Sequence, residues 1–164
     1  MTKLVDILYE SDASLYDYNS SKGYVFRGVN EKTAVSYAQG KYLPTSLNEQ
    51  MPFDPVAVEM LVGEDYSEMS QEDIDAEIQN VCQWYDGSAE SVKGGLNTTS
   101  DSNVAIDYSN GEYVLVLKLI SSNYCNFGDN YVYVKSTKDV KLERIYDVSN
   151  EKLYSPEDFL KNLK

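Results

Sequence analysis

Apolar residues follow a helical period most clearly between Ser70 and Asp86. The apolar positions in this segment keep the i, i+4, i+7, i+8, i+11 spacing of one helix face, and they are Ile74, Ile78, Val81, Cys82 and Tyr85. Ser70 can cap the N-terminus of such a helix, and Gly87 can stop it. The pattern therefore predicts an amphipathic helix over Ser70–Asp86.

Four shorter segments also carry helix signals. Lys3–Tyr9 places leucine and isoleucine on one side of a short helix. Asn30 is a suitable N-cap for a helix that Gly40 closes. Asp101–Tyr108 has a short apolar face, and Ser155 is followed by proline and acidic residues, as at a helix start. We expect helices at all four places.

Runs of β-branched and aromatic residues predict strands, mostly in the second half of the chain. The predicted strands are Tyr24–Phe26, which ends at Gly28, then Leu96–Thr99, Gly111–Ile120, 130–136 and 140–148. The proline-containing segment Thr45–Pro55 is predicted to be a loop. Helices mixed into the first half and strands in the second half favour the α+β class. We expect a single domain over residues 1–164, with helices mainly in its first half and a mostly antiparallel sheet as its core.

The composition excludes several kinds of chemistry. The chain has 164 residues and no histidine, which excludes histidine acid–base catalysis, Ser-His-Asp triads and most transition-metal sites. The sequence contains no GxGxxG, Walker-type loop, CxxC or HExxH motif. The acidic stretch Gly63–Asp75 lacks the spacing of an EF-hand loop. No metal site is therefore predicted.

The cysteines and the apolar runs bear on location. Cys82 and Cys125 are the only cysteines, and neither a signal peptide nor a membrane span is indicated. Two isolated cysteines without an export signal favour reduced thiols in a cytosol over a disulfide framework. We therefore expect a cytoplasmic protein that does not cross a membrane.

The charge of the chain bears on its partners. The formal net charge is −13, and a surface of this sign repels free DNA and RNA. Such a charge confers solubility, and it also suits a protein that binds a basic partner or imitates nucleic acid. The 15 tyrosines suit half-buried strands and contact surfaces. A protein partner is therefore expected, and free nucleic acid is not.

Two segments place chemically capable residues at strand ends. In VFRGVNEKTAVSYAQG (25–40), a strand ends in Arg27-Gly28 before a helix, and in LNTTSDSNVAIDYS (96–109), a strand ends in a hydroxyl triplet before an alanine-bearing helix. In this order the segments resemble the mono-ADP-ribosyltransferase family of the arginine–serine–glutamate type. That family includes bacterial toxins and enzymes that phages use on host proteins. GDNYVYVKSTKDVKLERIYDV (128–148) is similar in layout to the family's third, glutamate-bearing element.

The resemblance implies an ADP-ribosyltransferase-like fold with NAD as substrate. The NAD-binding residues that it implies are Arg27, Gly28, Thr98, Thr99, Ser100 and Tyr108. Arg27 would hold the diphosphate by charge-assisted hydrogen bonds, and Gly28 would allow close backbone approach. Ser100 and the two threonines before it would support the ribose next to nicotinamide. Tyr108 would offer an aromatic surface near the nicotinamide ring.

The catalytic carboxylate is where this sequence departs from the family. The reaction breaks the nicotinamide–ribose bond through an oxocarbenium-like transition state, which a carboxylate stabilises. The family's catalytic glutamate aligns with Tyr131, and the acid two residues earlier aligns with Asp129. The catalytic residues implied are thus Arg27, Ser100 and Asp129, with Glu143 on the final strand as the alternative carboxylate.

The leading hypothesis is an NAD-dependent mono-ADP-ribosyltransferase that modifies an intracellular host or defence macromolecule, as a phage effector does. The rival hypothesis is a non-enzymatic acidic inhibitor or nucleic-acid mimic that binds a basic protein surface. A third hypothesis is an accessory protein of a phage tail or capsid. Loss of function in Arg27 and Ser100 variants distinguishes the enzyme, whereas steep salt dependence distinguishes the mimic.

Overall fold

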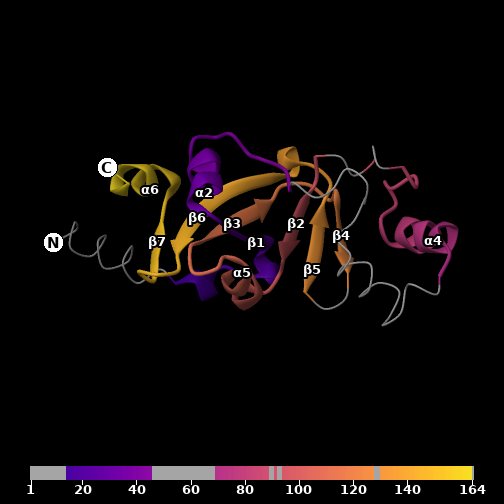
Figure 1. Ribbon diagram of the computed structural model, residues 1–164, viewed down its shortest axis with the longest axis horizontal. Helices are drawn as coiled ribbons and strands as arrows, with labels where there is room; N and C mark the ends of the chain where they lie inside the picture. Colours follow the sequence, from indigo (N-terminus) through magenta and orange to yellow (C-terminus); the bar gives the residue numbers. More distant parts are fainter. Residues whose placement is uncertain (1–13, 46–68, 89–90, 92–93, 128–129, 164) are drawn as a thin grey trace.

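The fold is known from a computed structural model that describes residues 14–45, 69–88, 91, 94–127 and 130–163. Within these residues, seven strands form one sheet with the order β4-β5-β2-β1-β3-β6-β7, and all neighbours are antiparallel (Figure 1). The strands are β1 (Tyr24–Val29), β2 (Leu96–Thr99), β3 (Tyr113–Leu119), β4 (Tyr124–Phe127), β5 (Tyr131–Val134), β6 (Val140–Asp147) and β7 (Lys152–Tyr154). The predicted α+β class and antiparallel sheet are confirmed.

The helices are spread along the chain. The described α-helices are α2 (Glu31–Ala38), α4 (Gln71–Val81), α5 (Ser102–Tyr108) and α6 (Pro156–Asn162), with short 3-10 helices η1 (Leu15–Asp17), η2 (Ser20–Lys22) and η5 (Thr137–Asp139). Among the described α-helices, α2 and α4 lie in the first half of the chain and α5 and α6 in the second, so helix placement is mixed and not mainly in the first half. The helix expected over Lys3–Tyr9 lies outside the described residues.

Local caps explain where the helices begin. The side chain of Asn30 accepts a hydrogen bond from the backbone N–H three residues later, and Ser70 and Ser155 do the same at α4 and α6. The helix α4 ends at Val81 instead of Asp86, because the backbone at Cys82 is already extended. The apolar residues beyond that point continue to face the core without continuing the helix.

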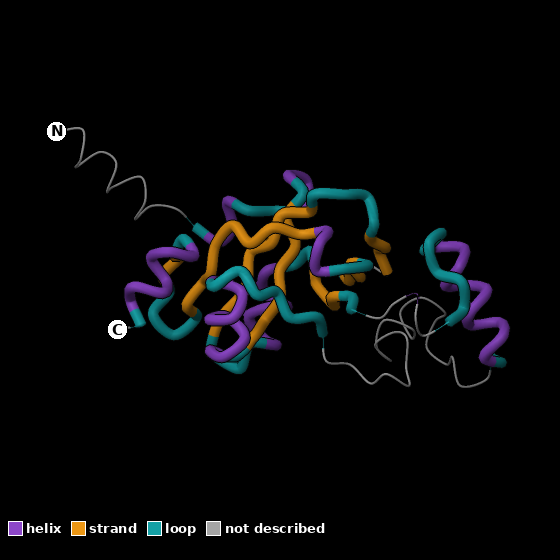
Figure 2. The backbone as a smooth tube through the Cα atoms, turned by 90° about the horizontal axis from the view of Figure 1, so that it is seen from above, coloured by secondary structure: helices purple, strands orange, loops and turns teal. Residues whose placement is uncertain are grey.

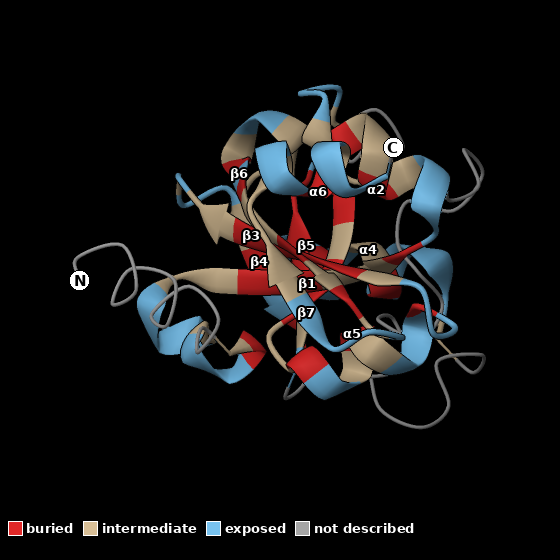
Figure 3. Ribbon diagram, turned by 90° about the vertical axis from the view of Figure 1, so that its left-hand side faces the viewer, coloured by how far each residue is buried: buried red, intermediate tan, exposed pale blue. Residues whose placement is uncertain are grey.

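The two faces of the sheet carry separate apolar clusters, and helices cover both faces (Figure 3). Alternate residues of a strand point to opposite faces, so Val25 and Phe26 of β1 enter different clusters. Helices α2 and α6 cover the face of Val25, where Phe159 is buried. Helix α5 covers the face of Phe26, where Ala105 is fully buried. The strand β1 therefore lies in the middle of a three-layer arrangement.

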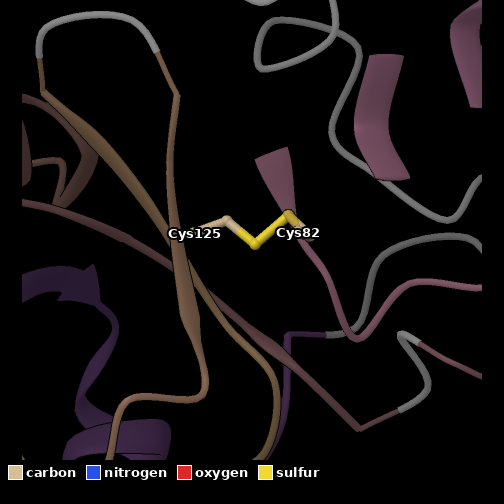
Figure 4. The surroundings of a disulfide bond; sticks show 2 residues. All are labelled: Cys82 and Cys125. Atoms are coloured by element: carbon tan, nitrogen blue, oxygen red, sulfur yellow. A yellow bond between two sulfur atoms is a disulfide. The ribbon is translucent and has the colours of Figure 1, made fainter. Parts of the chain in front are cut away.

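Helix α4 lies beside the edge strand β4, at one end of the molecule (Figures 1 and 2). Its residues Ile74 and Ile78 enter a third apolar cluster with Phe127 of β4. A disulfide joins Cys82 to Cys125 of β4, with a Cα–Cα separation of 5.4 Å (Figure 4). The expectation of two reduced thiols is therefore wrong, and the cytoplasmic location inferred from them loses that support.

Candidate functional site

Arg27 is placed by the pairing of β1 with its two neighbours. β1 pairs with β3 along its whole length, but with β2 through one residue pair, Phe26 and Thr99. Because the strands are antiparallel, the next residues along them are Arg27 and Thr98. The arginine of the first motif and the triplet of the second are therefore adjacent in space.

Beyond that single pair, side chains replace the backbone ladder between β1 and β2. Nη1 of Arg27 donates to the carbonyl oxygen of Asn97 at 2.9 Å and to Oγ1 of Thr45 at 2.7 Å. The backbone N–H of Asn97 donates to the same Thr45 oxygen at 2.9 Å. We call Arg27, Thr45 and Asn97 the seam. It satisfies the Asn97 backbone groups where β1 has no pairing with them, because buried peptide groups need partners.

The charge of Arg27 has no counter-ion in the part of the chain that the structure describes. The guanidinium is largely buried, and burial lowers its pKa, with the phenols of Tyr37 and Tyr131 acting in the opposite direction. Among the described residues, no carboxylate forms a salt bridge with it and its buried Nε has no hydrogen-bond partner. Phenols are uncharged at neutral pH, so the cation is not neutralised by these neighbours.

The hydroxyl triplet is bonded mainly to β5. Oγ1 of Thr98 donates to the carbonyl of Val132 at 2.7 Å, and Oγ1 of Thr99 donates to the carbonyl of Asn130 at 2.8 Å. The Ser100 hydroxyl is 3.5 Å from that same Asn130 carbonyl, which makes this a long and weak hydrogen bond. Ser100 therefore carries the hydroxyl of the triplet that is least committed to the fold.

Gly28 allows a close backbone approach, but the segment that approaches it is helix α5 and not a ligand. A Cβ at this position would lie 2.3 Å from the carbonyl oxygen of Ala105 and 2.6 Å from the backbone nitrogen of Ser109. The close approach is thus made by α5, and the space over Gly28 is filled by the protein itself. The inference that Gly28 opens the backbone to a ligand is corrected accordingly.

Tyr108 and Glu143 lie away from the seam. Tyr108 is 68% exposed on α5, which packs over Gly28 on the face opposite to Arg27. Glu143 is on β6, two strands beyond β1; burial and, after it, the charge of Glu143 raise the pKa of Tyr24. The structure does not bring either residue to Arg27.

The position of the catalytic carboxylate stays a prediction. Asp129 lies outside the described residues. The next residue, Asn130, accepts a hydrogen bond from the Ser100 backbone N–H at 2.8 Å. Tyr131, which aligns with the family's glutamate, begins β5 opposite Thr99.

The sequence reasoning missed Thr45 and Asn97. Thr45 falls in a segment predicted as a loop, and Asn97 contributes its backbone rather than its side chain to Arg27. A threonine before a loop and a peptide carbonyl carry no sequence signal of this contact. Only the path of the chain after α2 brings Thr45 back to the sheet, where its N–H donates to the Gly95 carbonyl.

The described part of the chain contains neither a metal-binding cluster nor a helix that could span a membrane. No group of three or more cysteine, aspartate or glutamate side chains there is arranged to hold a metal ion. None of the described helices has the length and apolar character needed to cross a bilayer. No protein-family model, curated protein or solved structure matches this chain.

Proposed function

We propose that this chain is an NAD-dependent mono-ADP-ribosyltransferase that holds the NAD diphosphate at Arg27. One observation carries the proposal, namely a largely buried guanidinium that has no carboxylate partner among the described residues and lies beside Thr98. A buried charge without a counter-ion is unfavourable, so an anionic ligand is the natural partner of this cation. A diphosphate offers that charge and accepts charge-assisted hydrogen bonds.

The order of the strands supports the same function. The three segments that resemble the transferase family contain β1, β2 and β5, which are far apart in the sequence. They are consecutive neighbours in the sheet, in the order β5-β2-β1. A site made from an arginine, a hydroxyl triplet and a carboxylate needs this adjacency, because all three must reach one dinucleotide.

The hydrogen bonds suggest how the triplet divides its tasks. Thr98 and Thr99 fasten β2 to β5 through short bonds to backbone carbonyls. Ser100, with its long bond, is the hydroxyl that can turn toward the ribose of NAD. We assign Ser100 to ribose binding and the two threonines to positioning it.

The chemistry needs one carboxylate near that ribose. The bond between the anomeric carbon and the nicotinamide nitrogen breaks, and nicotinamide leaves as a neutral molecule. The acceptor side chain of the target attacks the same carbon and passes its proton to the carboxylate. We assign this role to Asp129, because its sequence neighbour Asn130 contacts Ser100, whereas Glu143 lies two strands away from β1.

The test measures NAD binding by calorimetry and nicotinamide release with labelled NAD in a cell lysate. Arg27→Lys is expected to lower both strongly, because lysine cannot reproduce the fixed fork of a guanidinium. The chain has one other arginine, so Arg144→Lys is a matched control that keeps both activities. Asp129→Asn should keep NAD binding and lose release. No NAD binding by the folded wild type would reject the proposal.

The rival function has its own supporting observation. Helix α4 exposes Glu72, Asp73 and Glu77, while Ile74 and Ile78 face the core. An acidic helix of this kind fits a basic protein surface. If the protein is an electrostatic inhibitor, replacing the three acids by their amides weakens its binding to the basic target. NAD binding at Arg27 stays unchanged in the same variant. Target binding that is lost when these acids are replaced, but is kept in Arg27→Lys, would favour the inhibitor.

A further inference from the structure

The nitrogens of the Arg27 guanidinium differ in their hydrogen bonds to the protein. Nη1 has two hydrogens, and both are used, one on the Thr45 hydroxyl oxygen and one on the Asn97 carbonyl. Among the described residues, the buried Nε has no hydrogen-bond partner, and no hydrogen bond is made by Nη2. One end of the planar group is therefore saturated by the protein, and the Nε–Nη2 edge is not.

Thr45 is fixed through both its backbone and its side chain. Its N–H donates to the Gly95 carbonyl at 3.0 Å, and its Oγ1 accepts from the Asn97 N–H at 2.9 Å. The residue whose hydroxyl receives Nη1 is therefore held at two points, at Asn97 of β2 and at Gly95 just before that strand. A guanidinium bonded to such an acceptor cannot rotate about its last side-chain bonds without losing the contact.

We infer that Thr45 is a positioning residue that orients Arg27 so that its Nε–Nη2 edge receives two oxygens of one phosphate group. The edge of a guanidinium presents two parallel N–H groups that match a phosphate bidentately. Because Nη1 is already held in place, the Arg27 side chain loses less conformational entropy when the ligand binds, and binding is stronger. This inference rests on the proposed anion site at Arg27, but it does not require transfer activity.

The experiment uses the full chain and inorganic pyrophosphate as the probe. Thr45→Val keeps the shape of the side chain and removes the acceptor, so pyrophosphate binding measured by calorimetry is expected to weaken about tenfold. Thr45→Ser keeps the hydroxyl and is expected to restore binding close to wild type. Thermal unfolding of each variant is recorded in parallel. Equal binding by Thr45→Val and Thr45→Ser, with both folded, would overturn the inference.

Nuclear magnetic resonance of the arginine Nε–H groups tests the same point in the unmodified protein. The chain has two arginines, and Arg144→Lys identifies which of the two Nε signals belongs to Arg27. Pyrophosphate should shift the Arg27 signal and leave the Arg144 signal in place. Binding without that shift, or no binding at all, contradicts the inference even if Thr45→Val fails to fold. Binding with the shift but no nicotinamide release would reject only the proposed transferase.

Discussion

The α4 corner and the seam attach parts of the chain to the same sheet by opposite means. At the corner, Ile74 and Ile78 pack into an apolar cluster and a disulfide adds a covalent link to β4. At the seam, three polar hydrogen bonds join β1, β2 and the segment after α2 around one buried charge. Burial of apolar side chains stabilises the corner. At the seam, burial removes a cation from water, which is unfavourable for folding.

This difference separates stability from function in physical terms. Apolar packing and a covalent cross-link are the main contacts that hold α4 at the corner, together with a hydrogen bond from the Tyr85 hydroxyl to Asp75. A buried arginine could be replaced by an apolar residue with little loss of stability, since its desolvation opposes folding. The seam is therefore the region where the chain keeps an arrangement that stability alone does not favour, and it is where we place the ligand.

The largest expected effect breaks the corner. The Cys82→Ser, Cys125→Ser double variant removes a cross-link between residues 43 apart, which the chain-entropy model values at roughly 4 kcal/mol of unfolding free energy. Denaturant unfolding with and without reductant measures the loss. Reductant should destabilise the wild type by a similar amount and leave the variant unchanged. An equal response of both proteins to reductant would contradict this prediction.

The next effect is on the face of the sheet behind the seam. Gly28→Ala places a Cβ 2.3 Å from the Ala105 carbonyl, which forces α5 away from β1. We expect a loss of about 3 kcal/mol, at the upper end for overpacked sites. Gly40→Ala is the control for added bulk, because a Cβ there meets nothing within 4 Å, although its positive φ of 84° adds strain. Comparable stability of Gly28→Ala and wild type would show that α5 can shift freely.

A smaller effect appears at alkaline pH, with one tyrosine in each region. Burial raises the pKa of Tyr37, near the seam, and of Tyr133, at the corner, to about 12. A raised pKa in the folded state means that stability is complete below pH 10 and is lost as pH rises toward 12. Each residue should remove about 1 kcal/mol near pH 11.

Phenylalanine variants assign that loss. Tyr37→Phe and Tyr133→Phe should each flatten the fall in unfolding free energy between pH 10 and 12, because the ionising group is gone. The two slopes measured by chemical denaturation sharpen the comparison, since Tyr37 also feels the nearby Arg27 charge, which lowers its pKa. Slopes identical to wild type in both variants would be the contrary result.

The smallest expected effect on stability is at Arg27 itself. Arg27→Met removes two hydrogen bonds but also removes the desolvated charge, so the unfolding free energy should change by less than about 1 kcal/mol. Pyrophosphate binding should disappear in the same variant. A stability loss above 3 kcal/mol would mean that the seam holds the fold together, and that the contrast with the corner is wrong.

Much of the fold follows from local signals. Asn30, Ser70 and Ser155 begin helices as predicted, since capping depends on the next few residues only. The strands β4 and β7 are not predicted, because YCNF and KLY contain none of the β-branched residues that mark the other strands. The disulfide is also missed, because sequence spacing does not reveal which cysteines approach each other.

The site is less predictable than the fold. Arg27 and Ser100 attract notice because a cation and a hydroxyl at strand ends indicate chemistry. Their adjacency depends on the pairing of β1 with β2. The role of Thr45 depends on its contact with Asn97, which is 52 residues away in the sequence. No local pattern encodes such contacts, since they arise only when the whole sheet has formed.

The single paired position between β1 and β2 bears on whether either half of the sheet is formed by one continuous piece of the chain. It divides the sheet into two plates, one of β4, β5 and β2 and the other of β1, β3, β6 and β7. The chain passes from plate to plate between β1 and β2, β2 and β3, β3 and β4, and β5 and β6. Because the chain crosses between them four times, neither plate can be cut out as one uninterrupted piece of polypeptide.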